Sequence, residues 1–159
     1  MDPLVRRATL TDLEDIASIH REAFPRQRDS ETWIRATLSA SPRLLTFVLV
    51  IDGSVIGYVF WAQKSGIRPS AILELDQIGI IHQCRNQGYG ERLIRESLSL
   101  ATAELKGNGQ SLKAVLVSTR TDNDAKRLYA KVLGAHVVAE IEGLYSATEV
   151  LMLAEHPDV

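Results

Sequence analysis

Hydrophobic residues recur at helical spacing in four stretches of the chain. The first begins at Thr11-Asp12-Leu13-Glu14, which has the form of a capping box with Thr11 as N-cap, and it ends before Pro25. The second runs from Asp29 or Ser30 to residue 40. The third follows Gly90 to about residue 106 and is closed by glycines, and the fourth covers residues 122–133 before Gly134. The pattern therefore predicts about four helices.

Strand patterns fill most of the remaining chain. Residues 44–51 and 55–63 are rich in apolar and β-branched residues and flank Asp52-Gly53, a two-residue hairpin turn. Residues 113–119 are almost continuously apolar, which is typical of a central strand buried on both faces. Further strands are predicted at residues 5–9, 71–81, 135–140 and 148–154.

The resulting element order is β-α-α-β-β-β-α-β-α-β-β. It predicts an α/β (α+β) fold with a mixed central sheet of six to seven strands, flanked by about four helices. The passage from residue 71 to residue 119 is expected to be a right-handed parallel crossover. Strict alternation along residues 71–81 places Glu74, Asp76, Ile78 and Ile80 on one face of the sheet.

Composition narrows the class of protein. The 159 residues are expected to form one domain, residues 1–159, and 45% of them are hydrophobic. A net charge of −2 gives no field that would gather nucleic acid. One cysteine, Cys84, excludes an internal disulfide, and the four histidines lack ligand spacing, so no metal is expected. No apolar run approaches the roughly 20 residues of a membrane span, and no signal-peptide pattern precedes the domain, so we expect a cytoplasmic protein without a membrane partner.

The segment Arg85-Asn86-Gln87-Gly88-Tyr89-Gly90 lies between a predicted strand and a predicted helix. A helix N-terminus offers unpaired N–H groups and the positive end of the helix dipole to a phosphate. Two glycines allow the backbone to approach a ligand closely, and Arg85 adds a charged fork. We interpret the segment as a pyrophosphate cradle, although two glycines alone would fit an ordinary tight turn.

Other phosphate motifs fit poorly. The dinucleotide fingerprint requires a third glycine at position 93, which is Leu93. The P-loop requires Gly-Lys-Ser/Thr, whereas Gly90 is followed by Glu91-Arg92. A nucleotide-binding α/β protein of another class therefore ranks last.

Ile80, His82, Arg85, Gly88 and Gly90, followed by an amphipathic helix, resemble the acetyl-CoA motif of the GNAT superfamily of N-acetyltransferases. Residues 128–135, Leu-Tyr-Ala-Lys-Val-Leu-Gly-Ala, are similar to a second segment of that family. His82 stands where the family usually has proline, and the glycine of the second segment lies one residue later than usual. The likeness extends over nearly the whole chain and implies the GNAT fold.

The resemblance implies that acetyl-CoA binds as the acyl donor. The family's asparagine position is occupied by Asp122, so we assign its role to Asn123, one residue later. Ile78 and Ile80 would contact the pantetheine arm through their backbones, as in an added strand. The implied cofactor-binding residues are Ile78, Gly79, Ile80, Arg85, Asn86, Gln87, Gly88, Tyr89, Gly90, Glu91, Asn123 and Tyr129.

The resemblance also implies acetyl transfer to a primary amine by direct attack in a ternary complex. Tyr129 is the expected general acid. Glu74, six residues before Ile80, is the first candidate for the general base; Asp76 or a water chain are the alternatives. Each carboxylate fits equally well as part of a solvated strand face or an ion pair.

Two readings of the function stay open from sequence. The first is an acetyl-CoA-dependent N-acetyltransferase whose acceptor is a small amine or a protein or peptide amine. The second is a non-catalytic GNAT-like module that senses CoA or binds a protein. A homodimer is compatible with both.

Overall fold

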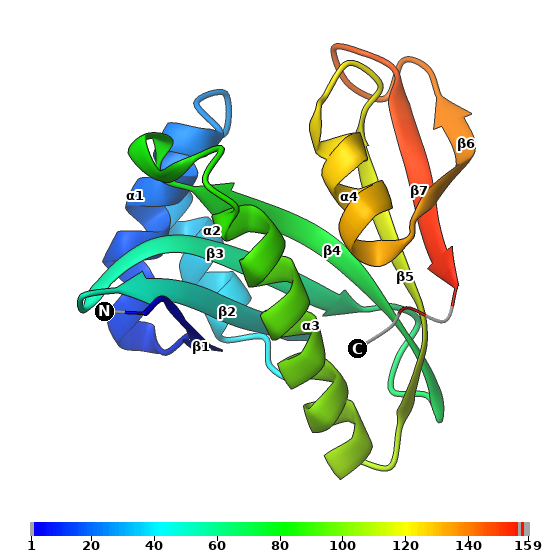
Figure 1. Cartoon of the computed structure of the whole chain (residues 1–159), viewed down its shortest axis with the longest axis horizontal. Helices are drawn as coiled ribbons and strands as arrows, with labels where there is room; N and C mark the ends of the chain where they lie inside the picture. The colour runs from blue at the N-terminus through cyan, green and yellow to red at the C-terminus, as the bar shows by residue number, and fades with distance from the viewer. Residues whose placement is uncertain (1, 156, 158–159) are drawn as a thin grey trace.

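The computed structural model describes residues 2–155 and 157 and contains one seven-stranded sheet with four α-helices (Figure 1). His156 lies outside the described residues. Two short 3-10 turns, Leu10–Asp12 and His82–Cys84, lie before α1 and before α3. The elements in chain order are β1 (Leu4–Arg7), α1 (Leu13–Ala23), α2 (Ser30–Leu38), β2 (Leu44–Ile51), β3 (Ser54–Gln63), β4 (Ser70–Ile80), α3 (Tyr89–Gly107), β5 (Ser111–Arg120), α4 (Ala125–Leu133), β6 (His136–Ile141) and β7 (Glu149–Glu155).

The strands lie in the order β1-β2-β3-β4-β5-β7-β6. Strands β4 and β5 are parallel, and every other neighbouring pair is antiparallel. The predicted element order, the mixed sheet and the central position of β5 are confirmed. The helix connecting β4 and β5 is α3, as the sequence pattern predicts.

Two hydrophobic cores cover the two faces of the sheet. Leu93, Ile94 and Leu98 of α3 pack with Tyr129 and Val132 of α4 against one face. The other core joins α1 and α2 to residues of β2 and β3. Figure 1 shows α3 and α4 on the near side of the sheet, with α1 and α2 behind it.

A β-bulge in β4 changes which residues share a face. Phe60 of β3 is opposite Gln77, whereas the next residue, Trp61, is opposite Leu75, so Asp76 is an extra residue in β4. Leu75 packs in the same core as Trp61, and Ile78 packs against that core after the bulge. The prediction that Glu74 shares a face with Ile78 is therefore wrong, because the extra residue shifts the alternation by one.

Strands β4 and β5 separate where the bulge begins. Their pairing starts at Ser70 and Ser111 and ends at Glu74 and Leu116. Beyond this point β4 keeps β3 as a neighbour on one edge only. Figure 1 shows the two strands diverging, with α4 on the β5 side of the opening and α3 beginning beyond the end of β4. A bulge increases the bend and twist of its strand, which accounts for this separation.

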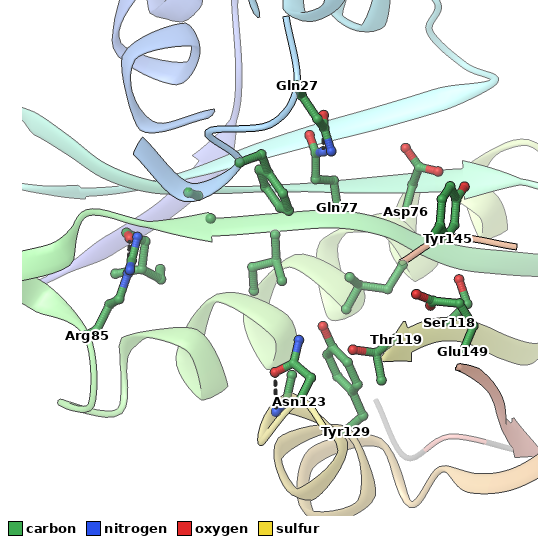
Figure 2. A pocket seen from close by; sticks show the side chains of 17 residues that line it. Gln27, Asp76, Gln77, Arg85, Ser118, Thr119, Asn123, Tyr129, Tyr145 and Glu149 are labelled. Carbon is green, nitrogen blue, oxygen red and sulfur yellow. Dashed lines mark hydrogen bonds between the residues drawn. The ribbon is translucent and has the colours of Figure 1, made fainter. Parts of the chain in front are cut away.

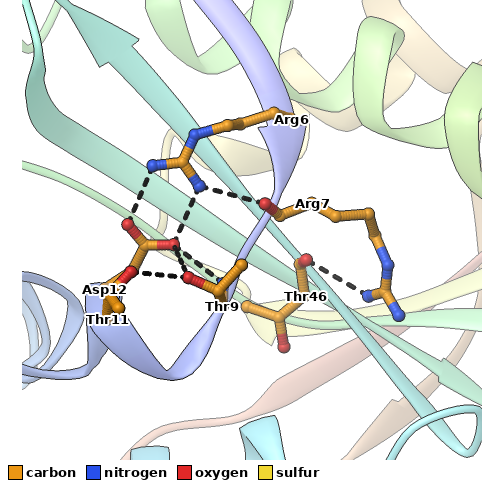
Figure 3. Close-up of polar contacts among 6 residues, drawn as sticks. All are labelled: Arg6, Arg7, Thr9, Thr11, Asp12 and Thr46. Atoms are coloured by element: carbon orange, nitrogen blue, oxygen red, sulfur yellow. Dashed lines mark hydrogen bonds and ion pairs between the residues drawn. The ribbon is translucent and has the colours of Figure 1, made fainter.

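The capping box before α1 lies at other residues than predicted, and it belongs to the 3-10 turn Leu10–Asp12. The backbone N–H of Thr9 donates to the Asp12 carboxylate over 2.8 Å, so the capping box expected at Thr11 and Glu14 is wrong. Arg6 of β1 donates to both oxygens of the same carboxylate, at 2.8 and 2.9 Å (Figure 3). Asp12 takes this place because Arg6, which belongs to β1 and not to the helix, supplies a positively charged partner for its carboxylate.

We expect Arg6→Ala to lower the free energy of unfolding by about 1–3 kcal/mol at pH 7, because it leaves the buried Asp12 carboxylate without its charged donor. Arg35→Ala is the matched control: its 2.9 Å pair with Glu31 is exposed, and such pairs contribute only about 0.3–0.5 kcal/mol. Urea unfolding of both variants measures the difference. Equal losses would contradict the assigned role of Arg6.

The Arg6–Asp12 ion pair also predicts how the stability of the protein changes at acidic pH. The hydrogen bond from Arg6 holds the pKa of Asp12 below its ordinary value. A lowered pKa in the folded state stabilises the protein above the ordinary aspartate pKa of about 3.9, and this stability is lost as the pH falls through the lowered value. The stability difference between wild type and Arg6→Ala is therefore expected to narrow below about pH 4.

Candidate active site

The separation of β4 and β5 forms a cleft of about 460 Å³ between the two strands (Figure 2). One wall comes from β4 and α1, and the other from β5, α4 and the start of β7. Its lining residues are Ala23, Phe24, Gln27, Leu75, Asp76, Gln77, Ile78, Gly79, Ile80, Arg85, Ser118, Thr119, Asn123, Ala125, Tyr129, Tyr145 and Glu149.

The predicted cradle lies at one end of this cleft, around a cavity of about 440 Å³. Asn86 and Gly88 have positive φ angles of 60° and 84°, and α3 begins immediately afterwards at Tyr89. No side chain caps the helix, and a Cβ at Gly88 would meet no atom within 4 Å. The first turn of a long helix thus presents its N–H groups to open space, the arrangement that binds phosphate.

A hydrogen bond explains why histidine replaces the usual proline at position 82. The backbone N–H of His82 donates to the carboxylate of Glu22 in α1, which a proline could not do. Glu22 also lies 3.6 Å from the Arg85 guanidinium, whose Nε donates to the Ile80 carbonyl over 2.8 Å. The turn between β4 and α3 is thereby tied to α1.

The structure brings most of the predicted cofactor-binding residues to the two adjoining cavities. Ile80, Arg85 and Asn123 line both of them. Two predicted residues line neither: the Gln87 side chain donates to the Gln83 carbonyl, and Tyr89 packs against the core. The others line one cavity, Ile78, Gly79 and Tyr129 the cleft and Asn86, Gly88, Gly90 and Glu91 the cradle cavity.

Tyr129 and Asn123 come from the segment that forms the far wall. Tyr129 is 5% exposed, and its hydroxyl lies at the cleft without a hydrogen-bond partner among residues 2–155. Burial raises the pKa of Tyr129 to about 12, so the hydroxyl keeps its proton at neutral pH. The Asn123 side chain accepts a hydrogen bond of 2.9 Å from the Ala125 N–H, which fixes it at the start of α4.

The two candidate bases occupy different surroundings. Glu74 does not line the cleft, and it forms a 3.0 Å ion pair with Lys64. Asp76, the bulge residue, lines the cleft and makes no hydrogen bond or ion pair with any residue that the structure describes. Desolvation raises the pKa of Asp76, and the negative charge of Glu74 adds to the shift. The geometry favours Asp76 over Glu74 as the carboxylate that meets a ligand.

A chain of polar side chains that is buried at His20 and Ser30 supports the β4 wall. Gln27 Oε1 accepts from the Gln77 amide over 3.3 Å and lies 2.8 Å from His20 Nε2. Because Oε1 can only accept, the proton of the neutral imidazole is on Nε2, and Nδ1 accepts from the Ser30 hydroxyl at 2.7 Å. Burial lowers the pKa of His20, which favours this neutral form. The chain holds the Gln27 and Gln77 side chains at the cleft.

Gln77, Tyr145 and Glu149 are among the cleft residues that sequence reasoning missed. Tyr145 belongs to the loop between β6 and β7, and no local pattern identified it. Glu149 begins β7 and is only 7% exposed. A carboxylate immediately before the apolar run of residues 150–154 was the available signal for it.

Two other features, a metal site and a membrane-spanning helix, are absent from the described part of the chain. No group of three or more His, Cys, Asp or Glu residues there could hold a metal ion. None of the helices in residues 2–155 is long and apolar enough to cross a membrane.

Comparisons with known proteins agree with this architecture. A profile of the Acetyltransferase (GNAT) family matches residues 13–135, more than half of the chain. The protein therefore belongs to the GNAT acetyltransferase family. No curated protein sequence matches the chain.

Solved structures share the fold at low sequence identity. Ard1 from Thermoplasma volcanium has a TM-score of 0.78 and 22% identity, over 99% of this chain and 100% of that one. Arabidopsis thaliana NAA60 in complex with acetyl-CoA has a TM-score of 0.79 and 19% identity, over 98% and 99%. The ribosomal-protein-S18-alanine N-acetyltransferase from Escherichia coli has a TM-score of 0.75 and 18% identity, over 99% and 96%.

Proposed function

We propose that the protein is an N-acetyltransferase that moves the acetyl group of acetyl-CoA to a primary amine by direct attack in a ternary complex. One observation carries this proposal. The cleft between β4 and β5 connects the uncapped N-terminus of α3 to the hydroxyl of Tyr129, which opens on the cleft, and to the unpaired carboxylate of Asp76. Membership of the GNAT family and the acetyl-CoA bound to a protein of the same fold support it.

The residues present fit acetyl-CoA. The N–H groups at the start of α3 and the open space at Gly88 suit its pyrophosphate. The edge of β4 that β5 leaves unpaired beyond Glu74 suits an extended amide-containing arm, which can add to a sheet as a strand does. When bound, the cofactor would supply an activated acetyl thioester.

The side chains of the cleft suit the proton transfers that the reaction needs. An amine with a pKa of about 10.4 must lose a proton before its nitrogen forms the bond to the acetyl carbon. Asp76, directly or through water, takes this proton. As the carbon–sulfur bond breaks, the Tyr129 hydroxyl gives its proton to the sulfur. With a pKa of about 12, the hydroxyl stays protonated at neutral pH until the thiolate forms.

Asp76→Asn is expected to lower kcat/KM about 100-fold at neutral pH, because an amide cannot accept the proton. Glu74→Gln, the matched control two residues away, is expected to change kcat/KM less than about threefold, since Glu74 lies outside the cleft. Glu74 raises the pKa of Asp76, so its neutralisation is also expected to move the acidic limb of the pH profile to lower pH. Initial rates between pH 5 and pH 9 measure both effects. Larger losses in Glu74→Gln than in Asp76→Asn would assign the base to Glu74.

The proposed function is tested first by calorimetric titration with acetyl-CoA, with CoA and ATP as comparators. Saturable binding of acetyl-CoA but not ATP, followed by release of free thiol with an amine present, is the expected result. Acetyl-CoA binding without thiol release over a broad set of amines would indicate a non-catalytic module. Binding of ATP alone would overturn the assignment.

A further inference from the structure

Glu149 is a buried carboxylate without a partner. Only 7% of its surface is exposed. Its side chain makes no hydrogen bond or ion pair with residues 2–155. Figure 2 shows it beside Ser118 and Thr119 at the cleft, on the opposite wall from Asp76. The residue as a whole has little access to water, and its carboxylate opens only on the cavities that it lines. An ionised carboxylate with so little access to water is stabilised by a cation or by hydrogen-bond donors. The position therefore indicates that a ligand supplies the missing partner.

The Arg120 guanidinium interacts with Glu149 only through its charge, and neither nearby arginine donates a hydrogen bond to the Glu149 carboxylate. Arg120, the neighbour of Glu149 across the sheet, donates two 3.0 Å hydrogen bonds to Asp122. Arg26 donates to the hydroxyl of Ser146 over 3.2 Å. Asp76 and Glu149 thus remain two unpaired carboxylates in the cleft.

The shape of the site favours an elongated acceptor. A second cavity of about 680 Å³ adjoins the cleft and shares Phe24, Tyr145 and Glu149 with it. Asp76 and Tyr129 line only the first cavity. An acceptor whose amine reaches Asp76 can therefore extend past Glu149. The rings of Phe24 and Tyr145 offer apolar surface to the segment of the acceptor that lies between these two carboxylates.

We infer that the acceptor carries a second cationic group, separated from the reacting amine by a short apolar stretch, and that Glu149 binds this group. The inference rests on the proposed function and deepens it. A free diamine and a peptide with a basic side chain near its N-terminus share this chemistry.

The test compares dicationic acceptors with monocationic acceptors of matched shape. Putrescine is paired with butylamine, and the peptide Ala-Lys-Ala-Ala-amide with its norleucine and glutamate analogues, each at saturating acetyl-CoA. In the wild type, kcat/KM for the dication is expected to exceed that of its matched monocation by about 10- to 100-fold, in the free amines or the peptides. The pair that shows the preference identifies the source of the cation.

Glu149→Gln is expected to remove this preference through KM while changing kcat/KM for the monocations less than about threefold. Glu140→Gln, an exposed carboxylate on the neighbouring strand β6, is the matched control and should retain it. Three results would overturn the inference. The wild type could show no preference for the dication, Glu149→Gln could keep the preference, or kcat could fall equally for dicationic and monocationic acceptors.

Failure of the proposed acetyl transfer can be distinguished from failure of the cation site. If no amine releases thiol, the cation site is tested separately by calorimetric titration of the protein–CoA complex with putrescine and with the lysine peptide. Binding that Glu149→Gln abolishes would support the cation site while overturning catalysis. Absent or unchanged binding would overturn the cation site as well.

Discussion

Tyr129→Phe is expected to lower kcat by about 100- to 1,000-fold while changing the Kd of acetyl-CoA less than about threefold. The substitution keeps the ring in the core formed by α3, α4 and the sheet, and removes only a hydroxyl that has no partner within residues 2–155. The thiolate that leaves would then lack its proton donor. Single-turnover rates and calorimetric titration, measured on the same preparation, separate the two quantities.

Tyr58→Phe is the matched control for this experiment. Tyr58 is also fully buried, and its hydroxyl donates to Gln77 over 3.2 Å rather than opening on the cleft. Its variant should lose stability without a comparable loss of kcat. An unchanged kcat in Tyr129→Phe would remove Tyr129 from the mechanism and leave the thiolate to solvent.

Gly88→Val is expected to weaken acetyl-CoA binding at least about 100-fold, because a branched side chain would occupy the space beside the N-terminus of α3 and block several phosphate hydrogen bonds. The φ of 84° adds strain for any L-residue, about 1–3 kcal/mol. Calorimetric titration of the folded variant with acetyl-CoA measures the binding loss.

Gly53→Val separates strain from obstruction. Gly53 lies in the β2–β3 turn with a φ of 80°, and a Cβ there also meets nothing within 4 Å. Both variants are expected to lose similar stability, but only Gly88→Val should lose acetyl-CoA. Wild-type affinity in Gly88→Val would mean that this segment is a turn and not a cradle.

Local sequence was sufficient for the features that depend on neighbours in the chain. Helical spacing, the Asp52-Gly53 turn and the apolar run of β5 predicted the elements and their order, because each is a short-range property. The cradle was predictable for the same reason, since its glycines and the following helix are contiguous. The resemblance of residues 128–135 to a segment of the GNAT family identified Tyr129, which the structure places at the cleft.

Tertiary structure decided the features that depend on partners distant in the chain. The bulge at Asp76 arises from how β4 pairs with Phe60 and Trp61 of β3, so strict alternation misassigned Glu74. The capping box lies at Thr9 and Asp12, in the 3-10 turn before α1, where Arg6 of β1 donates to the Asp12 carboxylate. Glu149 reaches the cleft because β7 pairs with β5 beyond the point where β5 leaves β4. The sequence by itself determined the elements, their order and the glycine turn before α3. Cross-strand pairing decided which carboxylates line the cleft, since a register shift of one residue exchanges the two faces of a strand.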